Sequence, residues 1–290
     1  MASAKVLQGI PVADAMKEDL QSRIAALKNR GTDPGLALLR VGDRPDDLFY
    51  EQAIQKTCAS LGISLKIFPF TPEISQQELE KKVLFISADK QVHGILFLAP
   101  LPARFDEKAV RSLIPAQKDV DGCNQVSAGK VFTDDTTGFP PCTPVACLEM
   151  LKFYNLPLTG KNAVIMGRSL VVGKPLAMLL LRENATVTIC HSKTENLPQI
   201  CREADLLVAA IGRPRAVGAD YIKPGQIILD VGVNPDPDNP GRYCGDVDFD
   251  SAAKIAAAIT PAPGGVGSVT TAVLAKHTIT AAERLFPIKK

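Results

Sequence analysis

The segment Asn162–Pro175 constrains this chain more than any other part of it, and it reads Asn-Ala-Val-Ile-Met-Gly-Arg-Ser-Leu-Val-Val-Gly-Lys-Pro. The apolar run Ala163–Met166 predicts a buried strand, Gly167 ends that strand, and Gly173 follows six residues later. A strand, a tight turn and a helix start in this order direct backbone N–H groups and the helix dipole towards a pyrophosphate. Because the spacing is Gly-x-Ser-x-x-x-Gly, and a glycine pattern alone often marks only a βα turn, the neighbouring residues decide its meaning.

The composition is typical of a soluble globular protein with two domains. The chain has 290 residues, of which 46% are hydrophobic and 22% are charged, so each of two domains can bury a core of its own. The 33 basic and 31 acidic residues leave a net charge of +2, and no long basic block occurs. Neither a nucleic acid nor an anionic membrane surface is therefore an expected partner.

Cysteine and histidine form no metal-binding pattern. The seven cysteines are scattered, with Cys142 and Cys147 five positions apart, and the three histidines are isolated. We therefore expect reduced structural thiols in a cytoplasmic protein, and no metal. Residues 1–10 lack both the apolar core of a signal peptide and an arginine-rich amphipathic pattern, and no run reaches the length of a membrane span.

Strands and helices alternate through the first part of the chain. The hydrophobic pattern predicts strands over 36–41, 65–70 and 94–99, and helices over 12–29, 46–61 and 105–113. Another helix starts at Ser75, because Glu78 three residues later completes a capping box. This alternation predicts an α/β fold with a parallel sheet whose faces are covered.

The stretch Pro115–Pro144 is turn-rich and has little periodicity, which is typical of a long functional loop. A helix then runs from Thr143 to about Tyr154. From Lys161 the alternation resumes, with strands predicted over 163–166, 186–190, 206–210 and 227–231, a loop over 234–241 and a long final helix over 268–285.

The residues after the strand predicted over 186–190 indicate which nicotinamide cofactor binds. An acidic side chain at that point would bind a ribose 2′-hydroxyl, whereas cations and hydroxyls suit a 2′-phosphate. The chain reads Cys190-His-Ser-Lys-Thr194 there, without a carboxylate, and Arg168 lies in the glycine turn. NADP is therefore favoured over NAD. The alternative is that Lys193 and Arg168 are merely solvated.

Taken together, the motifs resemble one family. They are Lys118-Asp-Val-Asp-Gly122, Pro141-Cys-Thr-Pro144, the glycine turn, Val187-Thr-Ile-Cys-His-Ser192, Asp230-Val-Gly-Val-Asn234, Gly245-Asp-Val247 and Ile259-Thr-Pro-Ala-Pro-Gly-Gly-Val-Gly267. In this order, and over nearly the whole chain, they resemble methylenetetrahydrofolate dehydrogenase/cyclohydrolase. The resemblance implies two αβ domains flanking a cleft: a folate-binding catalytic domain of residues 1–145 and 269–290, and a Rossmann-type NADP domain of residues 146–268. It also implies a homodimer, and a last helix that returns to the first domain.

The resemblance also implies the site residues. Tyr50 and Asp121 match the family's catalytic residues, with Tyr50 stacking on the substrate and Asp121 holding the pterin ring. The substrate would contact Tyr50, Leu98, Pro100, Leu101, Asp121, Pro263, Gly264 and Gly265, and the cofactor would contact Gly167, Arg168, Ser169, Gly173, Ser192, Lys193 and Val233. Read without the resemblance, Tyr50 is an ordinary half-buried aromatic residue and Asp121 is a turn cap.

The chain departs from the family at positions that matter for chemistry. The family carries Tyr-x-x-x-Lys, but the lysine position is Ile54 here, and the glutamine expected before Pro-Leu-Pro is Leu98. Lys56 is no substitute, because on a helix it lies about 240° around from Tyr50, whereas position 54 lies about 40° away. Cys123-Asn124 replaces the usual Phe-His, Ala146 replaces a common glycine, and Ser268-Val269 replaces Pro-Met.

These departures predict the activity. Oxidation of a methylene bridge needs no protein base, whereas hydrolysis of the methenyl product needs a positioned acid–base group. We therefore expect NADP-dependent oxidation of 5,10-methylenetetrahydrofolate, with cyclohydrolase activity absent or weak. Three alternatives remain open: a bifunctional enzyme that uses another proton-transfer group such as Asp121 with water, a folate-binding paralogue without turnover, and an NADP oxidoreductase with another small substrate.

Overall fold

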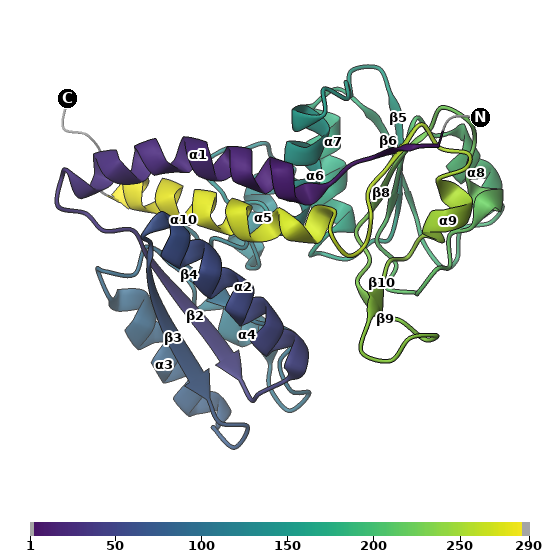
Figure 1. Ribbon diagram of the computed structural model, residues 1–290. Coiled ribbons are helices and arrows are strands. Elements are labelled where there is room, and N and C mark those ends of the chain that lie inside the picture. The colour runs from purple at the N-terminus through teal and green to yellow at the C-terminus, as the bar shows by residue number, and fades with distance from the viewer. Residues whose placement is uncertain (1–2, 286–290) are drawn as a thin grey trace. The chain divides into compact units, whose positions relative to one another are not determined.

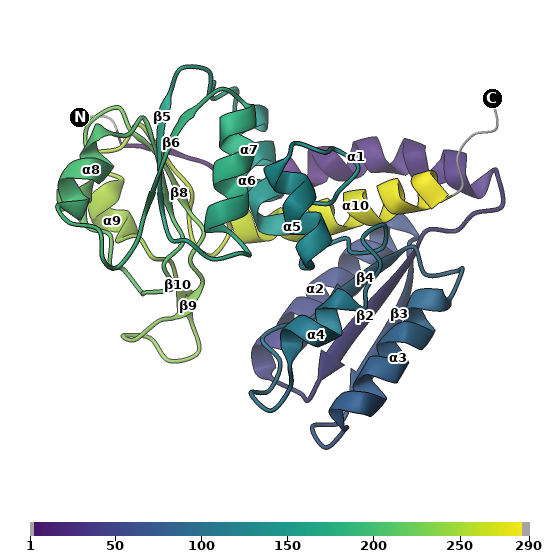
Figure 2. The same ribbon diagram turned by 180° about the vertical axis from the view of Figure 1, so that it is seen from behind.

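The computed structural model describes residues 3–285 (Figure 1, Figure 2). The chain divides into two compact units. One contains the chain up to Asp14 together with Thr143–Thr270, and the other contains Ala15–Cys142 and the chain from Thr271 onward. We name them the six-stranded unit and the three-stranded unit, after their main sheets.

The first fourteen residues differ from the predicted division, which placed residues 1–145 in one domain. Strand β1 (Lys5–Val6) pairs in parallel with β11 (Ala258–Ile259), so this segment completes the sheet of the six-stranded unit. A two-residue strand is too short to show a hydrophobic period, so the pattern of the sequence does not predict this pairing.

The three-stranded unit has a parallel sheet in the order β3-β2-β4. Its elements are β2 (Gly35–Val41), α2 (Pro45–Leu61), β3 (Ser64–Phe70), α3 (Gln76–Ala88), β4 (Gly94–Phe97) and α4 (Glu107–Ser112). Along β2, Ala37, Leu39 and Val41 pack in a buried cluster with side chains of α3 and α4. Because side chains alternate along a strand, Leu36 and Leu38 face the opposite side, which α2 covers (Figure 1). The three strands lie within two residues of their predicted positions.

Local signals define the ends of the helices in this unit. Helix α2 has Pro45 in its first turn and ends at Gly62, whose φ of 69° closes the helix in the left-handed region. The capping box predicted for α3 is confirmed, since Glu78 N–H donates to Ser75 Oγ at 3.2 Å and Ser75 N–H donates to Glu78 Oε2 at 3.2 Å.

The final helix, α10 (Thr270–Leu285), lies beside the part of α1 (Gly9–Lys28) that follows Asp14 (Figures 1 and 2). Arg23 holds the two helices together with a bidentate ion pair, Nη2 to Glu283 Oε2 at 2.6 Å and Nε to Oε1 at 3.0 Å. The last helix therefore belongs to the three-stranded unit.

The six-stranded unit has a parallel sheet in the order β1-β11-β8-β7-β5-β6. Its other elements include α6 (Cys142–Phe153), β5 (Asn162–Met166), α7 (Gly173–Arg182), β6 (Thr186–Cys190), α8 (Leu197–Glu203), β7 (Leu206–Ala209), β8 (Ile227–Asp230) and α9 (Phe249–Ala252). Val164, Met166, Leu207 and Ala209 pack in one core with residues of α8 and α9. Helix α7 lies on the other face of the sheet (Figure 1), so both faces are covered, as the alternation predicts.

Two segments predicted as loops contain short elements. Within Pro115–Pro144, helix α5 (Gln125–Phe132) begins at Asn124, whose side chain accepts a hydrogen bond from Ser127 N–H at 2.8 Å. The expected loop over 234–241 begins with β9 (Asn234–Pro235), which pairs with β10 (Tyr243–Cys244). Helix α5 and strands β9 and β10 are too short to show a clear hydrophobic period. Across residues 3–285, every helix is too short or too polar to cross a lipid bilayer.

A buried histidine on α10 makes the stability of the three-stranded unit depend on pH. His277 Nδ1 lies 2.8 Å from Val120 O, and its ring packs 5.1 Å from that of Phe139. Burial lowers the pKa of His277 to about 4 from an ordinary value of 6.5. This histidine is therefore neutral in the folded protein, and in the unfolded chain it takes up a proton at a higher pH.

We predict that the contribution of His277 to stability is present above pH 6.5 and is lost as the pH falls towards 4, amounting to about 3 kcal/mol. Denaturant unfolding at several pH values would measure the difference between the wild type and His277→Gln. The two stability curves should converge as the pH falls. A constant separation between them would contradict a neutral buried His277.

Candidate active site

The glycine turn, residues 167–173, connects β5 to α7 at the carboxyl edge of the six-stranded sheet. Gly167 has φ of 124°, and a Cβ there would lie 2.2 Å from Ala210 O; a Cβ on Gly173 would lie 2.1 Å from Gly167 O. Both positions therefore require glycine. Ser169 Oγ accepts a hydrogen bond from Val172 N–H at 3.0 Å, which folds the turn back on itself. The result is a compact cradle at a helix N-terminus, which fits a pyrophosphate.

The predicted cofactor residues lie at one edge of this sheet. From β5 the chain passes to β6 on one side and later to β7 on the other, so the strand order reverses between β5 and β7. Ligands of open α/β sheets bind beyond the carboxyl ends of the strands at such a point. Arg168 and Ser169 follow β5, Ser192 and Lys193 follow β6, and Val233 follows β8; all five are exposed.

Two buried carboxylates hold the neighbouring loops in place, and sequence reasoning missed their role. Asp246 is fully buried and accepts hydrogen bonds from three consecutive backbone N–H groups after β7, those of Ile211, Gly212 and Arg213, at 2.6, 3.1 and 2.8 Å. Asp230 accepts from the N–H groups of Gly232, Asp246 and Val247 at 2.9 to 3.0 Å. Burial raises the pKa of Asp230 to about 6, against the effect of these donors.

In the three-stranded unit, the predicted substrate residues also lie at the carboxyl edge of the sheet. Tyr50 is half-buried in α2, and Ile54 lies one turn further along that helix with 1% of its surface exposed. Leu98 directly follows β4 and is 6% exposed. Asp119 forms a parallel bridge with Ile95 of β4, so the chain from Asp119 to Asp121 runs beside this strand towards the same edge.

A set of buried polar contacts fixes the loop that carries Asp121. Lys118 Nζ donates to the carbonyl oxygens of Ser87 and Asp89, at 2.9 and 2.8 Å, and so binds the C-terminal end of α3. The buried Asp119 carboxylate accepts hydrogen bonds from the N–H groups of Cys123 and Asn124, both at 3.0 Å, and from Ser127 Oγ at 2.5 Å. Burial raises the pKa of Asp119 despite these three donors.

The Asp121 carboxylate has two close partners, which we name together with it the Asp121 cluster: Asp121, Cys123 and Cys142. Asp121 Oδ1 accepts from Cys142 N–H at 3.2 Å, and Oδ2 lies 3.2 Å from Cys123 Sγ. Burial raises the pKa of both Cys123 and Cys142, so both are neutral thiols at pH 7. The Cys123 thiol is therefore a donor to Asp121, and neither thiol is a base.

The remaining predicted substrate residues fall into two places. Pro100 and Leu101 follow β4 in the three-stranded unit, and Leu101 N–H donates to Glu107 Oε2 at 2.8 Å. Pro263, Gly264 and Gly265 belong instead to the six-stranded unit, after β11, where Gly264 O accepts a hydrogen bond from Gly9 N–H at 2.8 Å. Their predicted contact with substrate stays a prediction.

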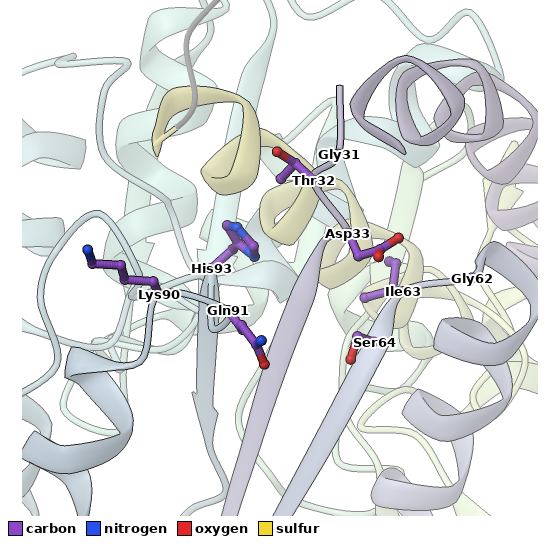
Figure 3. Close-up of a pocket in the computed structure, with 9 residues that line it drawn as sticks. All are labelled: Gly31, Thr32, Asp33, Gly62, Ile63, Ser64, Lys90, Gln91 and His93. Atoms are coloured by element: carbon purple, nitrogen blue, oxygen red, sulfur yellow. The ribbon is translucent and has the colours of Figure 1, made fainter. Parts of the chain in front are cut away.

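The structure places one cavity, of about 650 Å³, away from all of these residues. Figure 3 shows its lining, which comes from the loops before β2, β3 and β4 and from the first residue of β3: Gly31, Thr32, Asp33, Gly62, Ile63, Ser64, Lys90, Gln91 and His93. These loops are at the amino edge of the sheet, opposite the edge that carries Leu98 and Asp121. Among residues 3–285, no His, Cys, Asp and Glu side chains come together in a group of three or more that could hold a metal ion.

Comparison with known proteins identifies the family. Residues 7–121 match the model of the tetrahydrofolate dehydrogenase/cyclohydrolase catalytic domain, and residues 141–286 match that of the family's NAD(P)-binding domain. The chain belongs to the tetrahydrofolate dehydrogenase/cyclohydrolase family. Among its relatives, Bifunctional protein FolD of Carboxydothermus hydrogenoformans is 61% identical over 97% of this chain and 98% of its own length. Bifunctional protein FolD 1 of Desulfitobacterium hafniense is 47% identical over 96% and 98%.

Solved structures agree with this family fold. FolD methylenetetrahydrofolate dehydrogenase/cyclohydrolase from Campylobacter jejuni is 37% identical, with a TM-score of 0.94 over 97% of this chain and 99% of that one. The Trypanosoma brucei enzyme, complexed with NADP and an inhibitor, is 36% identical, with a TM-score of 0.94 over 99% and 100%. The expected two-domain α/β architecture and NAD(P)-binding domain are thus confirmed.

The glycine turn provides a direct test of the cradle. Gly167→Ala adds a Cβ that meets Ala210 O in a backbone conformation unfavourable for alanine, which costs about 1–3 kcal/mol before the clash is counted. We predict a lowered melting temperature and at least tenfold weaker NADPH binding, measured by fluorescence titration. Gly225→Ala is the matched control, because Gly225 also has positive φ but has nothing within 4 Å of its Cβ position. Equal effects of the two substitutions on NADPH binding would contradict the proposed cradle.

Proposed function

We propose that this family member oxidises 5,10-methylenetetrahydrofolate to 5,10-methenyltetrahydrofolate with NADP, and that its cyclohydrolase activity is absent or weak. Family membership supports the dehydrogenase half of this proposal. The observation that carries the second half is the burial of Ile54 and Leu98, at 1% and 6% exposure, at the two positions where the family resemblance implies a lysine and a glutamine.

The oxidation makes small demands on the protein. The methylene carbon lies between two folate nitrogens; its C–H bond breaks, the hydride leaves with both electrons, and a nitrogen lone pair stabilises the cation that remains. When bound, the oxidised nicotinamide supplies the hydride acceptor. The protein's part is to orient the substrate, and we assign that part to stacking by Tyr50 and hydrogen bonding by the Asp121 carboxylate.

Hydrolysis of the methenyl product requires water attack and proton transfer, for which α2 offers no suitable group. Ile54 and Leu98 carry no titratable proton, and Lys56 is exposed on a different side of the helix. Glu51, one turn before Ile54, is bound to Arg40 through a 2.8 Å contact between Nε and Oε2. Because the Glu51 carboxylate is buried and already paired with Arg40, we do not assign it the role of the missing lysine.

A bifunctional enzyme is the second candidate, because the relatives in C. hydrogenoformans and D. hafniense are named bifunctional proteins. In that case proton transfer would fall to Asp121 acting with water. A folate-binding paralogue is distinguished by folate binding without any NADP reduction. An oxidoreductase for another substrate is distinguished by failure to bind reduced folate. We also propose a cytoplasmic homodimer, which the family resemblance implies, and light scattering would test the oligomeric state.

Separate assays test the two activities. With NADP, we expect the wild type to oxidise methylenetetrahydrofolate; without cofactor, we expect methenyltetrahydrofolate to decay at close to its uncatalysed rate. The double substitution Ile54→Lys with Leu98→Gln should create measurable hydrolysis, because it supplies a proton-transfer group and a polar partner. Ile54→Lys alone should do less, since its ammonium would be buried against Leu98.

The matched control for this experiment is Lys56→Met, which removes an exposed lysine from the same helix and should change neither rate. Rapid enzyme-dependent decay of methenyltetrahydrofolate in the wild type would refute the loss of hydrolysis. Loss of that decay in Asp121→Asn would then support the bifunctional alternative.

The choice of NADP rests on the chemistry after β6. Ser192 and Lys193 are exposed there, and residues 190–194 contain no carboxylate, which suits a 2′-phosphate. We predict that Lys193→Ala raises the KM for NADP about tenfold and leaves the KM for NAD unchanged, as measured by paired cofactor titrations. Lys161→Ala, an exposed lysine at the amino end of β5, is the control. Equal changes for both cofactors would argue against a phosphate contact at Lys193.

A further inference from the structure

Within the Asp121 cluster, both oxygens of the carboxylate have a hydrogen-bond donor. Asp121 Oδ1 accepts from Cys142 N–H at 3.2 Å, and Oδ2 accepts from the Cys123 thiol, whose sulfur lies 3.2 Å away. The first donor is a backbone group at the start of α6, where the N–H groups of a helix lack partners within the helix. The second donor is a side chain, so its presence depends on which residue stands at position 123.

The backbone that carries the Cys123 thiol is itself held in place. Cys123 N–H donates to the buried Asp119 carboxylate at 3.0 Å. Gly122 has φ of 60°, and a Cβ there would lie 2.2 Å from Phe139 O, so the loop packs tightly against the chain that leads to Cys142. The thiol is therefore a donor whose backbone is positioned before any ligand binds, which lowers the cost of ordering the site on binding.

These two hydrogen bonds leave the Asp121 carboxylate able to bind more. An ionised carboxylate has about four lone-pair positions, two on each oxygen. Cys142 N–H and the Cys123 thiol use one position on each oxygen, so each oxygen can accept a further donor. Asp121 is half-buried, which leaves part of it open to a ligand. The carboxylate is thus arranged for a ligand edge with two adjacent N–H groups, such as the amino group and ring N–H of a pterin.

A thiol suits position 123 because it donates a hydrogen bond without adding a charge. Cys123 stays protonated at pH 7. A lysine or arginine there would form a charged pair with Asp121 and would compete with a ligand for its lone pairs. An apolar side chain would leave Oδ2 without this donor and the plane of the carboxylate less restrained. The thiol orients the carboxylate and leaves its negative charge for the ligand.

We propose that Cys123 is a positioning residue for folate and acts by fixing the plane of the Asp121 carboxylate. The inference rests on the proposed function and adds one residue to the same site. Because Cys123 acts through Asp121, we expect it to affect substrate binding and not hydride transfer. The family resemblance implies a phenylalanine at this position, which has no proton to donate, so the contact is a feature of this chain.

Three substitutions separate a hydrogen-bond donor from a side chain that only fills space. Cys123→Ala removes the thiol, and Cys123→Val puts a methyl group in the place of sulfur. We expect both to raise the Kd for tetrahydrofolate, measured by calorimetry, and the KM for methylenetetrahydrofolate about three- to tenfold. Cys123→Ser keeps a donor and should stay within about twofold of the wild type. In all three variants, kcat and the KM for NADP should stay within about twofold, since only uniform binding of folate is lost.

Cys58→Ala is the matched control, because Cys58 is a buried free cysteine of the same unit. It should leave each constant unchanged, even where the cavity that it creates lowers the melting temperature. Three results would overturn the proposal: unchanged Kd and KM in Cys123→Ala, rescue by Cys123→Val, or equal weakening by all three substitutions at position 123.

The calorimetric titration also separates this inference from the proposed function. A wild type that binds tetrahydrofolate without reducing NADP defeats the proposed function, while the comparison of Cys123→Ala with Cys123→Ser still tests the positioning role. A wild type that binds no reduced folate defeats both. A wild type that oxidises methylenetetrahydrofolate, with an unaffected Cys123→Ala variant, defeats the positioning role alone.

Discussion

Buried aspartate carboxylates bonded to backbone N–H groups hold the loops on which the candidate site depends. Asp246 holds the loop after β7, and Asp230 holds the loop after β8. Asp119 holds the loop that carries Asp121. A carboxylate in a protein interior is costly unless donors replace its lost water, and here the donors are the loops' own N–H groups. The loop conformation and the buried charge therefore depend on each other, and the exposed residues that are predicted to bind the cofactor lie next to loops that these buried carboxylates hold.

The sequence was sufficient for the framework. Strands such as 186–190 have a continuous apolar or alternating pattern, and Ser75 with Glu78 specifies a helix start by local hydrogen bonds alone. The glycine turn was equally predictable, because a Cβ at Gly167 or Gly173 would meet backbone that lies within seven residues or on the adjacent strand. A conformation that is determined by residues near in the sequence, or by contact with a neighbouring strand, can therefore be predicted from the sequence.

The contacts that tune the site were not predictable in the same way. Glu107 and Arg111 look like an ordinary surface pair on a short helix, and only the fold shows that Glu107 also accepts a hydrogen bond from the N–H of Leu101. Similarly, β1 has only two residues and is a strand only because it pairs with Ala258 and Ile259. Such contacts join segments that are distant in the chain, and no periodicity or motif records them. They form only when the folded unit has brought the two groups within hydrogen-bonding distance.

Under the proposed function, Ile54 and Leu98 in place of the family's lysine and glutamine would affect the two reactions in opposite directions. Hydrolysis would lack its proton-transfer group. Oxidation, however, generates a cation on the substrate, and a protonated lysine beside that cation would repel it in a medium of reduced dielectric constant. Isoleucine at position 54 removes this repulsion, and leucine at position 98 avoids leaving an amide without the lysine it would have bonded. Under the proposed function, replacing both polar residues, and not one, would therefore leave neither member of that pair unsatisfied and would place no like charge beside the oxidised product.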